Sequence, residues 1–351
     1  MEFGMQFFPD VSPEQKSAQQ YFDECLRLAQ LGDGYGWGHI RTVEHYFHPY
    51  GGYTPNPIVF LTAVSQRTKR ARLITGAVLP VFNHPLKIAG ELGMLDAISV
   101  GRLEAGFARA FLPHEFARFG VSLDESRDRF TEGMEQVRQL LERENVTSEG
   151  RFHSFKNTTS LPRPTQKPRP PFWVACTISP PSFAETGRSG HSIMAIPLAV
   201  KHMEELIELY RNARREAGHA GRGRVMLAFH MFCDENRERA WEIARAPMHR
   251  YLHSIVEAAS DWSTVKSKDY AGYEKMIEML SKETIESQVE SGAAWIGTPD
   301  DIAGQIERYV EGMGGFESAS LQVNFNTLGY EEAERSVRLF SEKVMPRFRD
   351  L

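Results

Sequence analysis

Two histidines and a carboxylate lie close together in the chain, directly after a short expected strand over Gly36–Ile40. The run reads Glu44-His45-Tyr46-Phe47-His48, and a stiff proline-containing segment follows it. Histidine is the side chain whose unperturbed pKa allows it to give or take a proton near neutrality. Each histidine alone is more often an ordinary surface or core residue, so the case for a catalytic site depends on what the fold brings near it.

Two arginines follow this cluster at positions that suit a phosphate group. Arg109 comes directly after an expected strand over Leu103–Phe107, and Arg127 lies in the first turn of the next expected helix. A planar guanidinium binds two phosphate oxygens at once, and a helix N-terminus adds a partial positive charge. Ion pairs at the surface with Glu115 or Asp124 are the ordinary alternative role for these arginines.

Hydroxyl side chains at Thr177, Ser179 and Ser182 follow the expected strand Phe172–Cys176 and could also donate to a phosphate. Ser179 has an ordinary role as the N-cap of the helix that begins at Pro180. A metal site is the competing interpretation of the histidine cluster, because His45, His48 and Glu44 could approach a cation. The other strand ends offer mostly poor ligands, such as Asn83 and Asn324, so we expect no metal.

The elements that must position these residues alternate between strand and helix along the whole chain. The expected strands are Phe3–Phe8, Gly36–Ile40, Arg72–Leu79, Leu103–Phe107, Phe172–Cys176, His191–Ile196, Arg224–Cys233 and Ala319–Asn324. Eight such units close naturally into a (β/α)8 TIM barrel, an α/β fold whose active sites lie at the carboxyl ends of the strands. An open doubly wound sheet would need a glycine-rich turn after its first strand, and the chain has none there.

Two stretches are expected to depart from this alternation. Residues 150–170 contain four prolines and are expected to form a loop. Residues 260–268 are mostly polar, with a single tryptophan, Trp262, and suggest a mobile excursion; a helix is expected over Tyr270–Glu290. We expect residues 260–290 to be a lid inserted after the seventh strand of a single barrel domain that spans residues 1–351.

Composition argues against several classes of function. The formal net charge of −5, without a basic stripe, argues against nucleic acid as the main partner. No apolar run approaches the roughly 20 residues that span a bilayer. The first residues lack the pattern of a signal segment, and three widely spaced cysteines predict neither a disulfide framework nor a zinc site. A cytoplasmic location is therefore expected.

A series of motifs resembles the bacterial luciferase-like flavin-dependent monooxygenases. The motifs are Glu44-His45-Tyr46-Phe47, Pro55-Asn56-Pro57, Thr75-Gly76-Ala77-Val78-Leu79-Pro80, His84-Pro85, Leu95-Asp96, Ser99-Val100-Gly101-Arg102-Leu103, Gly106-Phe107-Ala108-Arg109 and Ile296-Gly297-Thr298-Pro299-Asp300-Asp301. The resemblance implies a homodimeric barrel that binds FMN, which a separate NAD(P)H-dependent flavin reductase supplies in reduced form. It also implies that O2 and a small organic substrate, such as a carbonyl compound, react through a C4a-peroxyflavin.

The resemblance implies roles for individual residues as well. His45 matches the active-site histidine, a general acid or base. Residues that match the FMN site are Arg109 and Arg127 for the phosphate, Thr177 and Ser179 on the phosphate loop, and Thr75, Gly76 and Ala77 beside the isoalloxazine ring, often with a non-proline cis peptide. A glycine there would let the ring lie against the backbone. The substrate pocket is expected to be lined by Phe8, Glu44, Tyr46, Phe47, Phe107, Phe111 and Trp262.

The chain departs from luciferase at a few of these positions. Ala108 replaces a reactive cysteine, Cys176 replaces an acidic residue, and Pro180 and Pro181 replace hydroxyl residues. We infer that the two arginines hold the phosphate loosely enough for FMN to exchange. Two alternatives stay open: a deazaflavin-dependent oxidoreductase that transfers hydride without O2, and a flavin-binding protein without catalysis.

Overall fold

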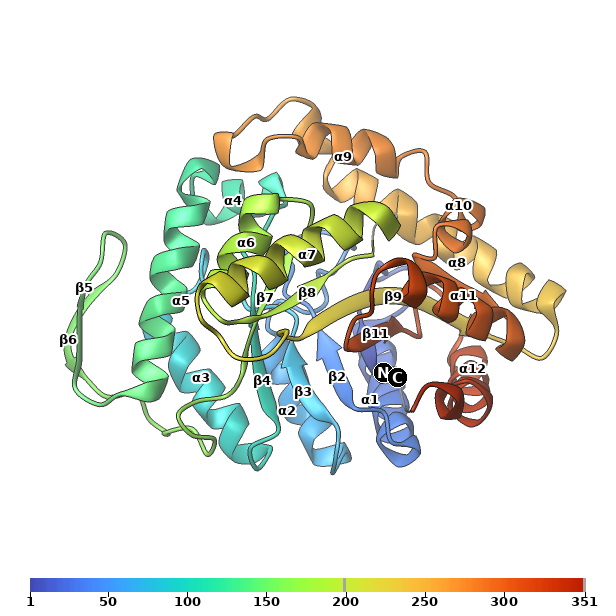
Figure 1. The fold of residues 1–351 in the computed structure, drawn as a ribbon, viewed down its shortest axis with the longest axis horizontal. Coiled ribbons are helices and arrows are strands. Elements are labelled where there is room, and N and C mark those ends of the chain that lie inside the picture. Colours follow the sequence, from blue (N-terminus) through green and yellow to red (C-terminus); the bar gives the residue numbers. More distant parts are fainter. Residues whose placement is uncertain (198–199, 350–351) are drawn as a thin grey trace.

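The computed structural model describes residues 1–197 and 200–349, and Figure 1 shows that they form a barrel of strands surrounded by helices. Within this part of the chain, eight parallel strands close on themselves in the order β1-β2-β3-β4-β7-β8-β9-β11. They are β1 (Glu2–Phe7), β2 (His39–Thr42), β3 (Arg72–Thr75), β4 (Leu103–Phe107), β7 (Phe172–Cys176), β8 (Ser192–Ala195), β9 (Val225–Cys233) and β11 (Ser318–Gln322). The expected (β/α)8 barrel is confirmed.

The long strand β9 is the seventh of the ring and the place where the insertion follows. Its first half pairs with β8 and β11, and its last residues pair with a further strand, β10 (Ala294–Gly297), outside the closed ring. The insertion after the seventh strand therefore follows β9 in the sequence and ends at β10.

Helices cover the barrel. They are α1 (Ala18–Tyr35), α2 (Pro57–Arg67), α3 (Pro85–Ile98), α5 (Ser126–Glu142), α6 (Pro180–Arg188), α7 (Val200–Glu216), α8 (Arg237–Ala258), α11 (Pro299–Gly312) and α12 (Tyr330–Lys343). In α11, the Thr298 side chain accepts from the Asp301 N–H, and the Asp301 carboxylate accepts from the Thr298 N–H. These two bonds satisfy backbone donors that a helix start leaves free.

Some boundaries differ from those expected from the sequence. β2 begins at His39 because Gly36 adopts a left-handed conformation (φ 85°) that ends α1. An antiparallel hairpin forms from β5 (Val146–Glu149) and β6 (Ser154–Thr158), and its buried side chains include Val146 and Phe155. Only β6 lies within residues 150–170, the stretch that was expected to be a loop.

The expected single helix over Tyr270–Glu290 is wrong. It is two helices, α9 (Tyr273–Leu280) and α10 (Ile285–Glu290), because Thr284 caps a new start through Ser287. A short helix, α4 (Pro113–Phe119), was not expected. The 3-10 helices are η1 (Leu123–Glu125), η2 (Ser260–Ser263), η3 (Lys268–Tyr270) and η4 (Met345–Phe348).

Ion pairs close the amino-terminal end of the barrel. Glu104 pairs with both Arg72 and Arg224, at 3.0 Å each, and accepts a hydrogen bond from the Trp173 indole at 2.6 Å. Trp173 packs with buried apolar residues of β3, β8 and β9. This filled interior leaves the carboxyl ends of the strands as the place for a site.

Candidate active site

A cavity of about 330 Å³ lies at the carboxyl ends of the barrel strands. Its walls come from the ends of β1, β2, β3, β4, β7, β8 and β9, and from helices α5, α6, α8 and α9. The volume lies within the range of roughly 300–1,000 Å³ that small-molecule sites occupy. Its position is that of active sites in barrel enzymes.

Most of the candidate residues border this cavity. Those that do are Phe8, Glu44, His45, Gly76, Ala77, Arg109, Phe111, Arg127, Thr177 and Ser179. The cavity wall does not include Tyr46, Phe47, Thr75, Phe107 or Trp262.

The side chains outside the wall have other partners. Side chains alternate along a strand, and Phe107 is the outward neighbour of Gly106, packing against Phe172 at 4.7 Å between ring centroids. The Thr75 hydroxyl donates to the Gly106 carbonyl. Phe47 is 55% exposed, and the Tyr46 hydroxyl donates to Glu44 from outside the cavity.

His45 is held by a carboxylate that sequence analysis had considered only as a partner for arginines. The Glu115 side chain on α4 is fully buried, and its Oε1 lies 3.1 Å from His45 Nδ1. The same oxygen accepts the Tyr46 backbone N–H at 2.8 Å. A carboxylate on Nδ1 fixes the proton there and orients the ring, which leaves Nε2 to exchange protons with a ligand.

Glu44 lies beside His45 in a buried polar cluster. Its carboxylate accepts hydrogen bonds from the Tyr46 hydroxyl, the Asn83 side chain (2.8 Å) and the Leu79 backbone N–H (3.2 Å). Burial nevertheless raises the pKa of Glu44 to about 7. This carboxyl group therefore changes charge close to physiological pH.

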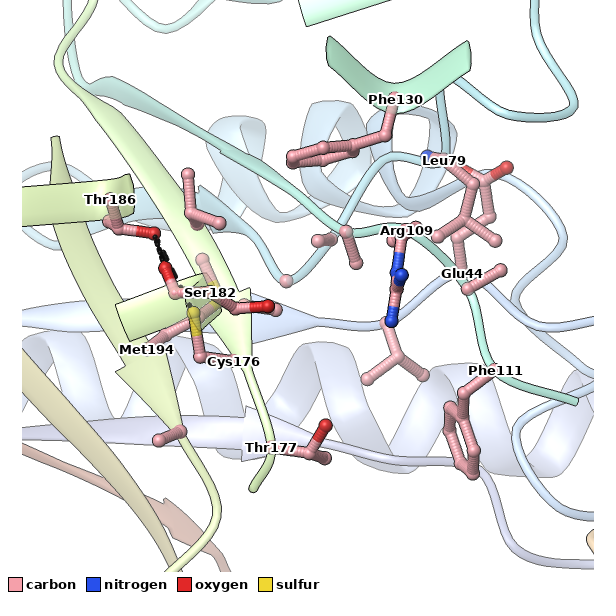
Figure 2. Close-up of a pocket in the computed structure, with 18 of the residues that line it drawn as sticks. Glu44, Leu79, Arg109, Phe111, Phe130, Cys176, Thr177, Ser182, Thr186 and Met194 are labelled. Atoms are coloured by element: carbon pink, nitrogen blue, oxygen red, sulfur yellow. Dashed lines mark hydrogen bonds between the residues drawn. The ribbon is translucent and has the colours of Figure 1, made fainter. Parts of the chain in front are cut away.

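Arg109 reaches into the cavity with part of its guanidinium unpaired. Figure 2 shows the Arg109 side chain between Phe130 and Phe111. Among the residues that the structure describes, no carboxylate lies within ion-pair distance of Arg109, and its Nη1 is buried without a hydrogen-bond partner. The guanidinium stacks over the Tyr270 ring at 4.2 Å. Arg127, on α5, has its Nε 3.7 Å from a carboxylate oxygen of Asp269.

The loop after β7 faces the same space. Ser179 is at the N-cap position of α6, but its side chain makes no capping hydrogen bond, so the ordinary role proposed for its hydroxyl is not filled. The Thr177 hydroxyl lies 2.8 Å from the Tyr273 hydroxyl. An FMN phosphate fits this part of the cavity, because Nη1 of Arg109 and the Ser179 hydroxyl are donors without acceptors among the residues that the structure describes.

The peptide bond between Gly76 and Ala77 is cis, as the resemblance implies. The structure gives a second reason for the glycine. A Cβ on Gly76 would lie 2.0 Å from Nε of Arg41. The absent side chain therefore makes room for Arg41, a residue that sequence analysis did not single out, and not only for a ligand.

Residues 260–290 lie against the segment that carries Arg109. The Trp262 indole donates to the Phe111 carbonyl at 2.9 Å, and the Tyr270 hydroxyl donates to the Ala110 carbonyl at 2.9 Å. Both rings are buried. In Figure 1 this segment, which includes α9, lies across one end of the barrel.

The metal interpretation has little support in this geometry. His48 Nδ1 accepts the Tyr50 backbone N–H at 3.1 Å. Within residues 1–197 and 200–349, no three histidine, cysteine, aspartate or glutamate side chains gather as a metal site would require.

No helix in the same ranges has the length and apolar character needed to cross a membrane.

Comparisons with known proteins identify the family to which the chain is similar. The family profile described as luciferase-like monooxygenase matches residues 1–315. The oxygenase component of the flavin-dependent trigonelline monooxygenase from Acinetobacter baylyi is 28% identical, over 99% of this chain and 96% of its own. Enzymes that depend on the deazaflavin F420 are also similar.

Two solved structures have the same fold. The crystal structure of monooxygenase RslO1 from Streptomyces bottropensis has a TM-score of 0.88 and 41% identity, over 99% of this chain and 100% of that one. The oxygenating constituent of 3,6-diketocamphane monooxygenase from Pseudomonas putida, in complex with FMN, has a TM-score of 0.82 and 22% identity, over 99% and 98%. The chain belongs to the luciferase-like monooxygenase family.

Proposed function

We propose that this protein is the oxygenase of a two-component system, which receives reduced FMN from a separate NAD(P)H-dependent flavin reductase and uses O2 to oxygenate a small organic substrate. The observation that carries the proposal is the cavity that both Arg109 and His45 border: Nη1 of Arg109 has no hydrogen-bond partner among the described residues, and a carboxylate holds the His45 imidazole. The name of the similar trigonelline enzyme, an oxygenase component, supports a separate reductase.

The residues around the cavity fit FMN in a definite direction. Arg109 and Arg127 would hold the phosphate, with the hydroxyls of Thr177 and Ser179 as further donors. The backbone of Gly76 and Ala77 would border the ring system. When bound, reduced FMN supplies the electrons that activate O2, and the protein supplies position and surroundings.

His45 would move the proton that oxygenation requires. Glu115 holds Nδ1, so Nε2 gives or takes a proton at the reacting oxygen of the substrate. Phe8, Tyr50 and Phe111 surround the imidazole, with ring centroids 5.6 to 6.0 Å from it. These rings would exclude water, and a dry site protects the reactive intermediates of oxygenation from hydrolysis.

Residues 260–290 would act as the lid of this site. Their contacts end on backbone carbonyls of Ala110 and Phe111, beside Arg109. Opening this segment would expose the phosphate end of the cavity, and closing it would keep water out during the reaction.

Oxygen use distinguishes this proposal from its alternatives. Purified protein with reduced FMN, 18O2 and a panel of aldehydes and ketones should yield product that carries one labelled atom. Replacing His45 with alanine should lower turnover by about 10²-fold. Anaerobic reduction of a substrate by reduced F420, without any reaction of FMN, would establish hydride transfer instead. FMN binding without turnover on any panel member would favour a non-catalytic flavin-binding protein.

The homodimer and the cytoplasmic location stay predictions. The homodimer prediction is supported by large apolar side chains that are exposed on the adjacent helices α2 and α3 and just after α3: Val59, Met94, Ile98 and Val100. Exposed apolar surface on neighbouring elements is a common feature of protein interfaces. Sedimentation of the wild type and of a Met94→Glu variant tests this prediction, since the variant should shift toward monomer.

A further inference from the structure

Arg41 is a second guanidinium that borders the cavity, and it comes from inside the barrel. It lies on β2, paired in register with Gln6 of β1 on one side and Ile74 of β3 on the other. Only 8% of the residue is exposed. Gly76 makes room for its side chain, and small residues of other strands, Ala195 and Ala228, border the same cavity.

The positive charge of Arg41 has no carboxylate partner in the described part of the chain. Its Nη1 donates to the Gln6 side-chain oxygen and its Nη2 to the Gly76 carbonyl at 3.2 Å. Both acceptors are neutral, and the buried Nε has no partner. Burial lowers the pKa of Arg41 to about 10, so the guanidinium is still charged at neutral pH.

The arginines at the other end of the barrel show the contrast. Arg72 and Arg224 share the Glu104 carboxylate there. A buried charge is normally paired, because removing an ion from water is unfavourable unless an opposite charge offsets the loss. Arg41 therefore has the character of a group that awaits an anion from a ligand.

The surroundings of Arg41 differ from the phosphate end of the cavity. Tyr251 lies close enough to Arg41 to raise its pKa. The Tyr251 ring packs against the rings of Phe8 and Tyr50, with 5.9 Å between ring centroids in each pair. Phe8 is in turn 5.8 Å from His45. Asp10, an acid close to this aromatic group, is hydrogen-bonded to Asn326 and does not border the cavity, whereas Glu44 does. A flat ligand would meet aromatic rings, one cation and the candidate catalytic imidazole.

We propose that Arg41 binds the carboxylate of a small, flat organic acid, and that such an acid is the substrate of this enzyme. The guanidinium presents parallel N–H groups that match the two oxygens of a carboxylate. The proposal rests on the proposed function in one respect, that the Arg109 end of the cavity holds the FMN phosphate and leaves the Arg41 end to the substrate.

Binding of acids and of their amides tests this assignment without any turnover. Benzoate, 2-naphthoate and cyclohexanecarboxylate, each beside its amide, are titrated calorimetrically into the protein with saturating oxidised FMN. We expect the wild type to prefer at least one acid over its amide by about 10- to 100-fold. Arg41→Gln should abolish that preference, and Arg41→Lys should keep part of it. The absence of any preference in the wild type, or its survival in Arg41→Gln, would overturn the proposal.

A matched control variant and a titration with reduced FMN distinguish a substrate carboxylate from the anionic flavin ring as the partner of Arg41. Arg224→Gln makes the same change at the amino-terminal end of the barrel, away from the cavity, and should leave the preference unchanged. If Arg41→Gln weakens only the binding of reduced FMN, the partner of Arg41 is the anionic flavin ring, and the substrate assignment is overturned. Because these titrations need no O2, a failure of the oxygenase proposal would appear separately, as missing product.

Discussion

Replacing Arg109 with methionine tests the phosphate site most directly. The substitution keeps a long apolar side chain against Tyr270, which Arg109 now covers at 4.2 Å. It removes the guanidinium whose Nη1 has no hydrogen-bond partner within the described ranges. The free energy of FMN binding should therefore fall by the value of a charge-assisted contact, while the cavity keeps its shape.

The size of the loss follows from the burial of the arginine. Truncating one partner of a buried charge pair costs about 2–5 kcal/mol. Arg109 is only partly buried, and Arg127 still borders the cavity, so we expect the lower part of this range, about 2–3 kcal/mol. That corresponds to a Kd for FMN raised about 30- to 150-fold.

Riboflavin provides the matched ligand, because it lacks only the phosphate. Fluorescence titration of both flavins into both proteins gives a two-by-two comparison in which the loss should appear for FMN alone. Arg118→Met is the control variant, since Arg118 is exposed on α4 and does not border the cavity. Equal losses for FMN and riboflavin would refute the reasoning and assign Arg109 to packing against Tyr270.

Three further predictions concern the residues around the cavity. Glu115→Gln removes the charge that orients His45, so kcat should fall about 10- to 100-fold while the Kd for FMN stays unchanged, as steady-state kinetics and titration would show; an equal change in both would indicate a general collapse of the site. Glu44 keeps its proton up to about pH 7 when folded but loses it near pH 4.5 when unfolded, so its contribution to stability is full below pH 4.5 and is lost as the pH rises through 7. The stability of Glu44→Gln, measured by urea unfolding, should therefore rise relative to wild type by about 3 kcal/mol between pH 4.5 and 8, and a difference independent of pH would contradict this. Gly76→Ala places a methyl group 2.0 Å from the neighbouring arginine and should destabilise the protein by about 1–3 kcal/mol, whereas Gly90→Ala, whose Cβ meets nothing closer than 3.7 Å, should not; equal melting temperatures for the two variants would contradict the crowding.

The barrel could be predicted from the sequence because its signals are repeated. Apolar strands and helices alternate eight times, and a single misplaced boundary does not change the count. The boundaries of helices and strands were less predictable where a single residue sets them. Gly36 ends α1 instead of starting β2, and Thr284 divides an expected helix in two. Each is a local backbone choice that tertiary packing settles.

The site could be predicted where its residues follow strands directly, as His45, Arg109 and Ser179 do. Two residues of the site were missed for physical reasons. Glu115 lies on a helix of seven residues, too short for a periodic pattern, and meets His45 across 70 positions of sequence. Arg41 was placed outside its strand, although in β2 it lies inside the barrel. The alternation of β4 explains a third difference: Gly106 faces inward, so Phe107 faces the helices.

The two ends of the barrel treat charge in opposite ways, and this has a practical consequence. At the amino-terminal end, Arg72 and Arg224 both pair with the Glu104 carboxylate. Neither guanidinium is therefore an unpaired positive charge that would bind a dissolved anion. Arg41 and Arg109, which border the cavity, have no carboxylate partner in residues 1–197 and 200–349. Sulfate or phosphate from a buffer will therefore compete with flavin and acid alike, and affinities measured in such buffers will understate those in chloride.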